Sequence, residues 1–499
     1  MSSMPEIKFF RHFFSRLATM PDLNNQVKIA TKWALVAEIC SKLVSPVTTM
    51  ILARLLAPTA FGIMVTATMI ISFAELFTDA GFQKYLIQKK FEDRESLINS
   101  TNVAFWSNLI LSIVFWLIIC VFSKVIAHLV GCDGYHWVII VSCVCIPLEA
   151  FSSIQMALFK KDLDFKTLFY VRLLGIFVPL FVTIPIAYFT GSYWALIIGM
   201  IASNLCNAVI LTYKSSWKPS LYYNIELFKQ MFSFSSWSMI ESVSIWLTLY
   251  LDVFIVGSVL NTYYMGLYRT SISTVSALFT IIISSTTPVL FSALSKLQSD
   301  ESQFRELFFK FQRLVGLFVF PMGVLVFFFS DLCTNILLGE QWDEAALFFG
   351  WWGLTNSLSI VTVNYCGEVY RAKGKPKITV FTQWCHLVFL VPVVLISIDY
   401  GYDTLCISRS LARLQLILVN LVALYIVIRI SFTDMIRNLK VPILGSLLLA
   451  GLLTIIPKPD SILLQLLYMS ISALIYLLFV CSFKDERAMI LNIKSSFIR

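Results

Sequence analysis

The chain has 499 residues, of which 58% are hydrophobic and only 13% are charged. Soluble domains of this length carry about 25% charged residues, so the polar residues here are too few to cover a water-soluble globule, and lipid must contact much of the surface. The formal net charge of +9 does not require nucleic acid as a partner, because a basic excess in a membrane protein usually lies in its cytoplasmic loops.

Cysteine and histidine usage excludes several kinds of site. The 11 cysteines are scattered singly, without the paired spacing of a disulfide framework or a zinc site. Only four histidines are present, so a histidine-based catalytic centre is hard to build, and we expect no cofactor and no metal. The basic first thirty residues lack a short apolar core followed by a small-residue cleavage site, so we expect no cleaved signal peptide.

Apolar runs of about 20 residues, the length that crosses a bilayer as a helix, recur along the chain. They predict an all-α integral membrane protein with about 14 transmembrane helices. The connections are short, so we expect no sizeable soluble domain. The predicted spans start near residues 30, 60, 101, 136, 168, 191, 230, 263, 312, 345, 377, 403, 440 and 461.

The distribution of Lys and Arg predicts the orientation. When loops are assigned from a cytoplasmic N-terminus, four of the 38 cations face outside and three lie within spans, which leaves 31 on the inside. This bias predicts a cytoplasmic position for both termini. The outer cations are Arg54, Lys124, Arg269 and Lys458, and those within spans are Lys42, Arg409 and Arg413.

A short internal repeat divides the spans into two blocks. The stretch "ILARLLAPTAFGIM" (51–64) aligns with "IVGSVLNTYYMGLY" (255–268) at an offset of 204 residues, which places Gly62 on Gly266. Both stretches lie at the outer turn between the first two spans of a block, and an even number of crossings separates them. The sequence therefore predicts two six-helix lobes in parallel repeat, as in two-lobed transporters, plus two C-terminal helices.

The predicted domain ranges follow from this plan. They are a cytoplasmic N-terminal segment (1–29), an N-terminal lobe of spans 1–6 (30–213), a cytoplasmic linker (214–229), a C-terminal lobe of spans 7–12 (230–430), spans 13 and 14 (431–483), and a cytoplasmic tail (484–499).

Charged side chains within spans are costly and are functional candidates by default. Glu38 and Lys42 lie four residues apart on one helical face, where they can neutralise each other. A structural ion pair is the favoured interpretation, and a coupling-ion or substrate role is the alternative.

Arg409 and Arg413 are also four residues apart, ~10–16 Å below the outer surface. Two like charges on one face need an anion, either a carboxylate on another helix or a ligand phosphate, for which the guanidinium is well shaped. We expect this pair to line a cavity. Arg172, Arg269 and Arg54 lie nearer to span ends and could line vestibules, although snorkelling is the simpler account.

A carrier coupled to H⁺ or Na⁺ needs a carboxylate within or near its spans. The sequence offers several candidates for coupling or gating and does not distinguish them. They are Glu38, Glu75, Asp79, Glu149, Asp252 and Glu368.

Three tryptophans, Trp342, Trp351 and Trp352, cluster near the ninth outer loop. This position predicts anchoring at the membrane interface, with sugar stacking as the weaker alternative.

Two signals of an enzyme are weak. Asp162 and Asp164 have the spacing with which nucleotide-sugar transferases hold a metal, but they lie in a short inner loop without a nucleotide-binding domain. The stretch "RAKGKPK" (371–377) contains too few glycines for a phosphate-binding loop, and no nucleophile-elbow, Walker or zinc-protease motif is present. We therefore predict that the protein is not an enzyme.

Several stretches together resemble the Wzx-type polysaccharide-unit flippases, close to the colanic-acid exporter branch of the multidrug/oligosaccharidyl-lipid/polysaccharide exporter superfamily. The resemblance begins with "ILARLLAPTAFGIM" and the signature "TDAGFQKYLIQKK" (78–90). It continues with "QMALFKKDLDFKTL" (155–168), "LDVFIVGSVLNTYYMGLY" (251–268), which puts Asp252 on the acidic position, and "LLGEQWDEA" (337–345). The last third of the chain matches no motif of the family.

The resemblance implies a flippase that moves undecaprenyl-pyrophosphate-linked oligosaccharide from the cytoplasmic to the outer leaflet of a bacterial inner membrane, by alternating access between two lobes. Its expected partners are the lipid-linked oligosaccharide, membrane lipids and possible polysaccharide-assembly membrane proteins, with no nucleic acid. One alternative is a drug or small-cation exporter of the same superfamily, which favours an acidic cavity and twelve spans. Another is a membrane glycan polymerase, which needs a long catalytic outer loop.

Overall fold

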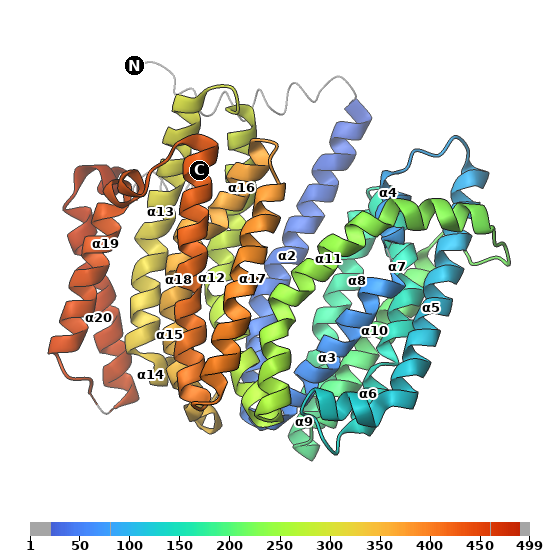
Figure 1. Ribbon diagram of the computed structural model, residues 1–499, viewed down its shortest axis with the longest axis horizontal. Helices are drawn as coiled ribbons and strands as arrows, with labels where there is room; N and C mark the ends of the chain where they lie inside the picture. The colour runs from blue at the N-terminus through green and yellow to red at the C-terminus, as the bar shows by residue number, and fades with distance from the viewer. Residues whose placement is uncertain (1–20, 80, 460, 490–499) are drawn as a thin grey trace. The chain divides into compact units, whose positions relative to one another are not determined.

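A computed structural model describes residues 21–79, 81–459 and 461–489, and all regular structure in these ranges is helical (Figure 1). Thirteen of the described helices or consecutive helix pairs are long and apolar enough to cross a membrane. The predicted fold class, an all-α membrane protein, is therefore confirmed. Helix α2 (Pro21–Leu55) covers the first predicted span, although many of its side chains lie outside the described residues.

The helices group into two compact units. Of the described residues, those in 21–48, 67–126 and 135–242 form unit 1, and those in 49–66, 127–134 and 243–489 form unit 2. Unit 2 therefore includes two short segments from the first half of the chain. The predicted domain ranges remain predictions.

Unit 1 is built around α10 (Trp194–Lys214), which packs against both α7 (Cys145–Lys161) and α8 (Phe165–Val178). The short helix α4 (Phe82–Gln88) packs against α7. Its core contains Phe82, Leu86, Phe105 and Ile154. The other helices that lie wholly or partly in unit 1 are α2 (Pro21–Leu55), α3 (Pro58–Thr78), α5 (Arg94–Leu129), α6 (His136–Ser142), a π-helical turn (Pro179–Thr183), α9 (Ile184–Thr190) and α11 (Ile225–Val259).

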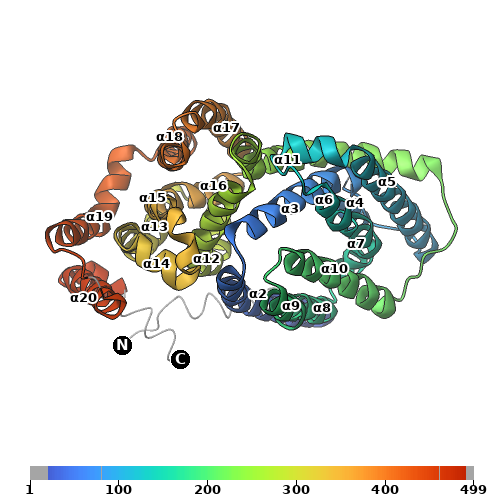
Figure 2. The same cartoon turned by 90° about the horizontal axis from the view of Figure 1, so that it is seen from below.

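Unit 2 is organised around α13 (Glu301–Phe328), which packs against α15 (Ala346–Ser359) and α19 (Phe432–Ile455). Beside it, α18 (Tyr402–Ile428) packs against α15 and α17 (Lys377–Ile398) (Figure 2). Its other elements are α12 (Thr262–Lys296), α14 (Ser330–Leu337), a 3₁₀ turn (Glu340–Ala345), a π-helical turn (Ile360–Asn364), α16 (Tyr365–Ala372) and α20 (Ile462–Cys481), together with the ends of α2 and α5, the start of α3 and the second half of α11.

The two C-terminal helices α19 and α20 pack against each other and against α13. Their interface contains Leu317, Leu449 and Val480, and the Tyr476 hydroxyl donates a 2.9 Å hydrogen bond to the Leu317 carbonyl. The hydroxyl of the buried Tyr476 is thus satisfied by a backbone acceptor. The last two predicted spans are therefore packed parts of unit 2.

Two glycines that the sequence repeat aligns contact each other within unit 2. A Cβ on Gly62 would clash with the carbonyl of Thr262, and a Cβ on Gly266 would clash with the carbonyl of Pro58. Since Pro58 and Thr262 are also related by the offset of 204, the contact is reciprocal. Such reciprocity is the signature of a two-fold relation, and only glycine allows the backbones of α3 and α12 to approach this closely.

The tryptophan interpretation is wrong for two of the three residues. Trp342 and Trp352 are 0% and 1% exposed, so they lie inside the protein and not at a lipid interface. The Trp342 indole donates a 2.8 Å hydrogen bond to the Ala53 carbonyl and packs edge-on against Phe61. Burial of the indole and its N–H is possible because the end of α2 supplies an acceptor.

Part of the predicted orientation signal falls outside the described residues. This applies to Lys8, Arg11, Arg16, Lys494 and Arg499.

Candidate functional site

A buried charge cluster lies among α11, α12 and α18 of unit 2. The Arg409 Nε donates a 2.7 Å hydrogen bond to Asp252 Oδ2 and lies 3.1 Å from the Tyr268 hydroxyl oxygen. Tyr268 in turn donates a 2.9 Å hydrogen bond to Asp252 Oδ2. The side chains of Arg409 and Asp252 are only 7% and 3% exposed. We call Asp252, Tyr268, Arg409 and Arg413 the Asp252 cluster.

Arg413 lies one helical turn after Arg409, on the same face of α18, but its contacts differ. Its Nη1 donates a hydrogen bond to Asn356 Oδ1 of α15. Its guanidinium lies 3.7 Å from the ring centroid of Trp352, and that of Arg409 lies 4.9 Å from the same ring. No carboxylate within the described ranges forms an ion pair with Arg413. The Asp252 cluster thus contains two guanidinium groups and one carboxylate.

The sequence left two alternatives for the anion beside the two arginines, a carboxylate on another helix or a ligand phosphate, and the two arginines differ in this respect. Arg409 forms an ion pair with a carboxylate on another helix. Arg413 contacts an amide and an aromatic face, which stabilise a cation without neutralising it. The Arg409 Nη1 atom is also buried and makes no hydrogen bond to any described residue. An excess positive charge of this kind attracts an anion.

Unit 1 contains a second site with two cations and one carboxylate. Glu38 of α2 forms a 3.0 Å ion pair with Lys42 through Oε1 and a 2.8 Å ion pair with Arg172 of α8 through Oε2. The predicted Glu38–Lys42 pair is therefore present, and Arg172 joins it from a different helix. All three side chains are partly exposed, at 40%, 20% and 46%.

Three predicted carboxylates gather in unit 1. Glu75 of α3 interacts electrostatically with Glu149 of α7 and with Asp79, which follows α3 by one residue. Glu75 Oε1 and Asp79 Oδ1 are both buried without a hydrogen-bond partner among the described residues. Burial raises the pKa of Asp79, although Gln83 and the nearby Lys84 oppose this effect. A proton shared within this acidic group would relieve the repulsion between neighbouring carboxylates.

The remaining candidates make other contacts. Arg269 donates a 3.3 Å hydrogen bond to the Leu249 carbonyl and lies over the ring of Tyr250. Glu368 forms a 2.7 Å ion pair with Arg371. Asp164 accepts hydrogen bonds from the backbone N–H and the hydroxyl of Thr167, so it caps α8.

Sequence reasoning missed Tyr268, Trp352 and Asn356, which complete the surroundings of the two arginines. Tyr268 had a signal, because the repeat aligns it with the apolar Met64. Trp352 was predicted to lie at the membrane interface. Asn356 had no signal of its own, although it lies one turn after Trp352 on the same helix. In the described ranges no three metal-ligating side chains gather into a metal site.

Comparisons with known proteins identify relatives over most of the chain. The model of a family described as "Polysaccharide biosynthesis protein" matches residues 51–347. An uncharacterized membrane protein from the cps region of Klebsiella pneumoniae is 23% identical over 374 residues, which are 74% of this chain and 76% of the relative. The succinoglycan biosynthesis transport protein ExoT of Rhizobium meliloti is 20% identical and the lipopolysaccharide biosynthesis protein WzxC of Escherichia coli 21%, with 81% and 79% of each chain covered.

Among solved structures, the lipid II flippase MurJ in an inward closed conformation matches with a TM-score of 0.71 at 15% identity. The match covers 91% of this chain and 99% of MurJ. At this identity the likeness concerns the fold alone, which is an all-helical membrane fold like that of MurJ.

Proposed function

We propose, from the premise that the chain belongs to the family of polysaccharide biosynthesis proteins, that it is a flippase for lipid-linked oligosaccharides. It would move undecaprenyl-pyrophosphate-linked repeat units from the cytoplasmic to the periplasmic leaflet of a bacterial inner membrane. The family is one of multi-pass membrane transporters and not of enzymes. What we propose beyond family membership is the kind of substrate, the two leaflets and the direction of movement.

The names of the relatives support transport during polysaccharide assembly. ExoT is described as a transport protein of succinoglycan biosynthesis, and WzxC as a protein of lipopolysaccharide biosynthesis. Both relatives match over most of their own length. The products differ between them, so the glycan carried by this protein is not assigned by likeness.

The observation that carries the proposal is the excess of positive charge at two sites, one buried in unit 2 and one on predicted spans in unit 1. The Asp252 cluster and the Glu38–Lys42–Arg172 site each contain two cations for one carboxylate. A charge within the membrane that is not neutralised by the protein is costly, and a pyrophosphate group is a ligand that would neutralise it. Arg413 is the strongest candidate, since its guanidinium fork suits phosphate oxygens.

The acidic group of Glu75, Asp79 and Glu149 is the candidate for ion coupling. Burial of several carboxylates together favours uptake of a proton or a cation. Binding of H⁺ or Na⁺ there, and its release on the other side, would bias an alternating-access cycle in one direction. The same group would suit a small-cation exporter, which is the second candidate function. Export of cationic dyes by the purified protein would favour that alternative.

Deletion in the host, followed by analysis of lipid-linked glycans, tests the proposed function. We expect complete repeat units to accumulate on the inner leaflet. Accumulation on the outer leaflet would instead indicate that a later step, such as polymerisation, has been lost.

A further inference from the structure

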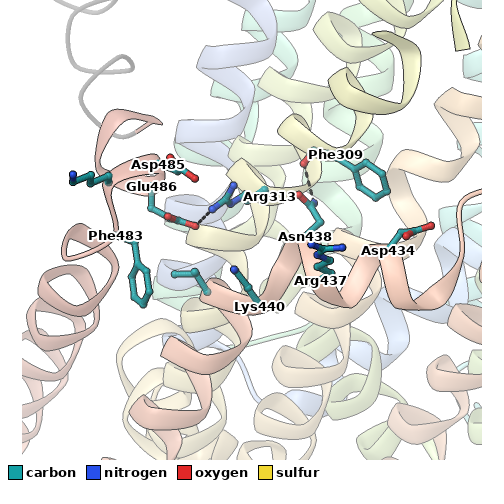
Figure 3. A pocket seen from close by; sticks show the side chains of 11 residues that line it. Phe309, Arg313, Asp434, Arg437, Asn438, Lys440, Phe483, Asp485 and Glu486 are labelled. Atoms are coloured by element: carbon teal, nitrogen blue, oxygen red, sulfur yellow. Dashed lines mark hydrogen bonds and ion pairs between the residues drawn. The ribbon is translucent and has the colours of Figure 1, made fainter. Parts of the chain in front are cut away.

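A cavity of about 490 Å³ lies in unit 2, away from the charged sites described above (Figure 3). It is lined by Arg313 of α13, by Arg437 and Lys440 of α19, and by Lys484 and Glu486 in the segment that follows α20. Three parts of the chain therefore meet around it. Its size falls within the range of small-molecule sites, about 300–1,000 Å³.

Most acidic groups around this cavity are already engaged. Glu486 is 1% exposed and forms an ion pair with Arg313, drawn as a dashed line in Figure 3. Asp434 caps α19 by accepting hydrogen bonds from the backbone N–H and hydroxyl of Ser431. Glu486 is therefore engaged by Arg313, whereas Asp434 keeps its charge and interacts electrostatically with Arg437.

The lining holds one more cation than carboxylates: Arg313, Arg437, Lys440 and Lys484 against Asp434, Asp485 and Glu486. Of these cations, only Arg313 forms an ion pair within the described ranges. Arg437 and Lys440 are three residues apart, so they share a face of α19. The Arg313 Nε is a buried donor that makes no hydrogen bond to any described residue. The cavity thus combines excess positive charge with an unsatisfied buried donor.

The surroundings of the cavity are those of a membrane surface. It lies at the start of α19 and after the end of α20, and Ile436 and Phe432 beside it are 44% and 59% exposed. Large apolar side chains with this exposure on a membrane-spanning helix face lipid. By the predicted orientation this end of the helices is cytoplasmic, where basic pockets between transmembrane helices bind anionic headgroups.

We propose that this cavity is a binding site for a phosphate ester, with Arg437 and Lys440 as its principal cationic contacts. The phosphate comes from the headgroup of an anionic phospholipid or from a soluble phosphate compound. The site is independent of the proposed flippase activity, since none of its residues belongs to the charged sites assigned to substrate or coupling. Occupancy would tie α19 and the segment after α20 to α13.

The test uses the purified full-length protein in phosphatidylcholine nanodiscs. Binding of dioctanoyl phosphatidylglycerol probes the lipid source, and binding of glycerol 1-phosphate probes the soluble source, both by calorimetry. The variant Arg437→Gln/Lys440→Gln removes two exposed cations of the lining. The control Lys375→Gln/Lys377→Gln removes two exposed cations at the start of α17, also on the predicted cytoplasmic side.

We expect the wild type and the control variant to bind at least one of the two probes. Arg437→Gln/Lys440→Gln should bind it about 25-fold more weakly, which is about fivefold for each cation near a membrane surface. Preference for the phospholipid or for glycerol 1-phosphate identifies the source. The proposal is overturned if neither probe binds, if the lining variant binds as tightly as the wild type, or if the control loses as much affinity.

Discussion

The guanidinium of Arg409 on α18 and the carboxylate of Asp252 on α11 form a buried ion pair 2.7 Å long, across 157 positions of sequence. This pair assigns Arg409 to the positioning of α18 against α11. It leaves Arg413, one turn further along, as the arginine of the Asp252 cluster without a carboxylate partner in the described ranges. The two arginines should therefore respond differently to substitution.

Removal of one member of the pair should destabilise the protein. Arg409→Gln leaves the Asp252 carboxylate buried and unpaired, and loss of a partner from a buried ion pair costs about 3–5 kcal/mol. Asp252→Asn/Arg409→Gln should recover much of this loss, because no buried charge remains unpaired. Thermal unfolding in detergent measures both effects. Equal unfolding temperatures for Arg409→Gln and the wild type would show that the ion pair does not stabilise the protein.

Substitution of Arg413 should impair transport without loss of protein. Arg413→Gln removes a cation that no described carboxylate neutralises, so we expect a transport rate about 10- to 100-fold lower, the range for loss of a hydrogen bond to a charged group. Arg413→Lys should recover part of the rate, since it keeps the charge but loses the planar fork. Arg429→Gln is the matched control, because Arg429 is an exposed arginine at the end of the same helix, α18. Normal transport by Arg413→Gln would exclude this residue from substrate binding.

The glycines at the crossing of α3 and α12 should tolerate no side chain. Gly62→Ala and Gly266→Ala each place a methyl group against a backbone carbonyl, and overpacking of this kind costs about 1–3 kcal/mol. Because the contact is reciprocal, the two losses should be similar. Gly451→Ala in α19 is the control, since a Cβ there meets no atom within 4 Å. The amount of folded protein in membranes gives the comparison, and a loss with Gly451→Ala alone would contradict it.

The buried carboxyl of Asp79 should make stability depend on pH. Burial raises its pKa in the folded protein above the ordinary value of 3.8, so the folded state holds this proton to higher pH than the unfolded state. Its contribution to stability is therefore lost as the pH rises from about 3.8. Asp79→Asn should raise the unfolding temperature at neutral pH and flatten its dependence on pH. An unchanged pH profile would show that Asp79 ionises without cost.

Hydropathy alone predicted the fold class, because lipid forces each crossing segment to satisfy its own backbone and to be apolar along its length. The repeat around Gly62 and Gly266 was readable as well, since close backbone approach requires glycine at both positions. The Arg409–Asp252 pair was not predictable, because it depends on which helices are neighbours. The prediction for Trp352 was wrong for a related reason. Its indole packs against the guanidinium of Arg413, but a tryptophan near a span end is equally typical of a membrane interface.

Flipping by the purified protein in liposomes tests the central claim most directly. Fluorescently labelled undecaprenyl-pyrophosphate oligosaccharide in both leaflets is exposed to a membrane-impermeant quencher. In liposomes that contain the wild type, we expect the quencher to remove nearly all of the fluorescence, because labelled lipid from the inner leaflet reaches the outer leaflet. With Arg413→Gln at equal protein content, we expect the fluorescence to fall far more slowly. Quenching that stops at the outer leaflet, as in protein-free liposomes, would contradict the proposed function.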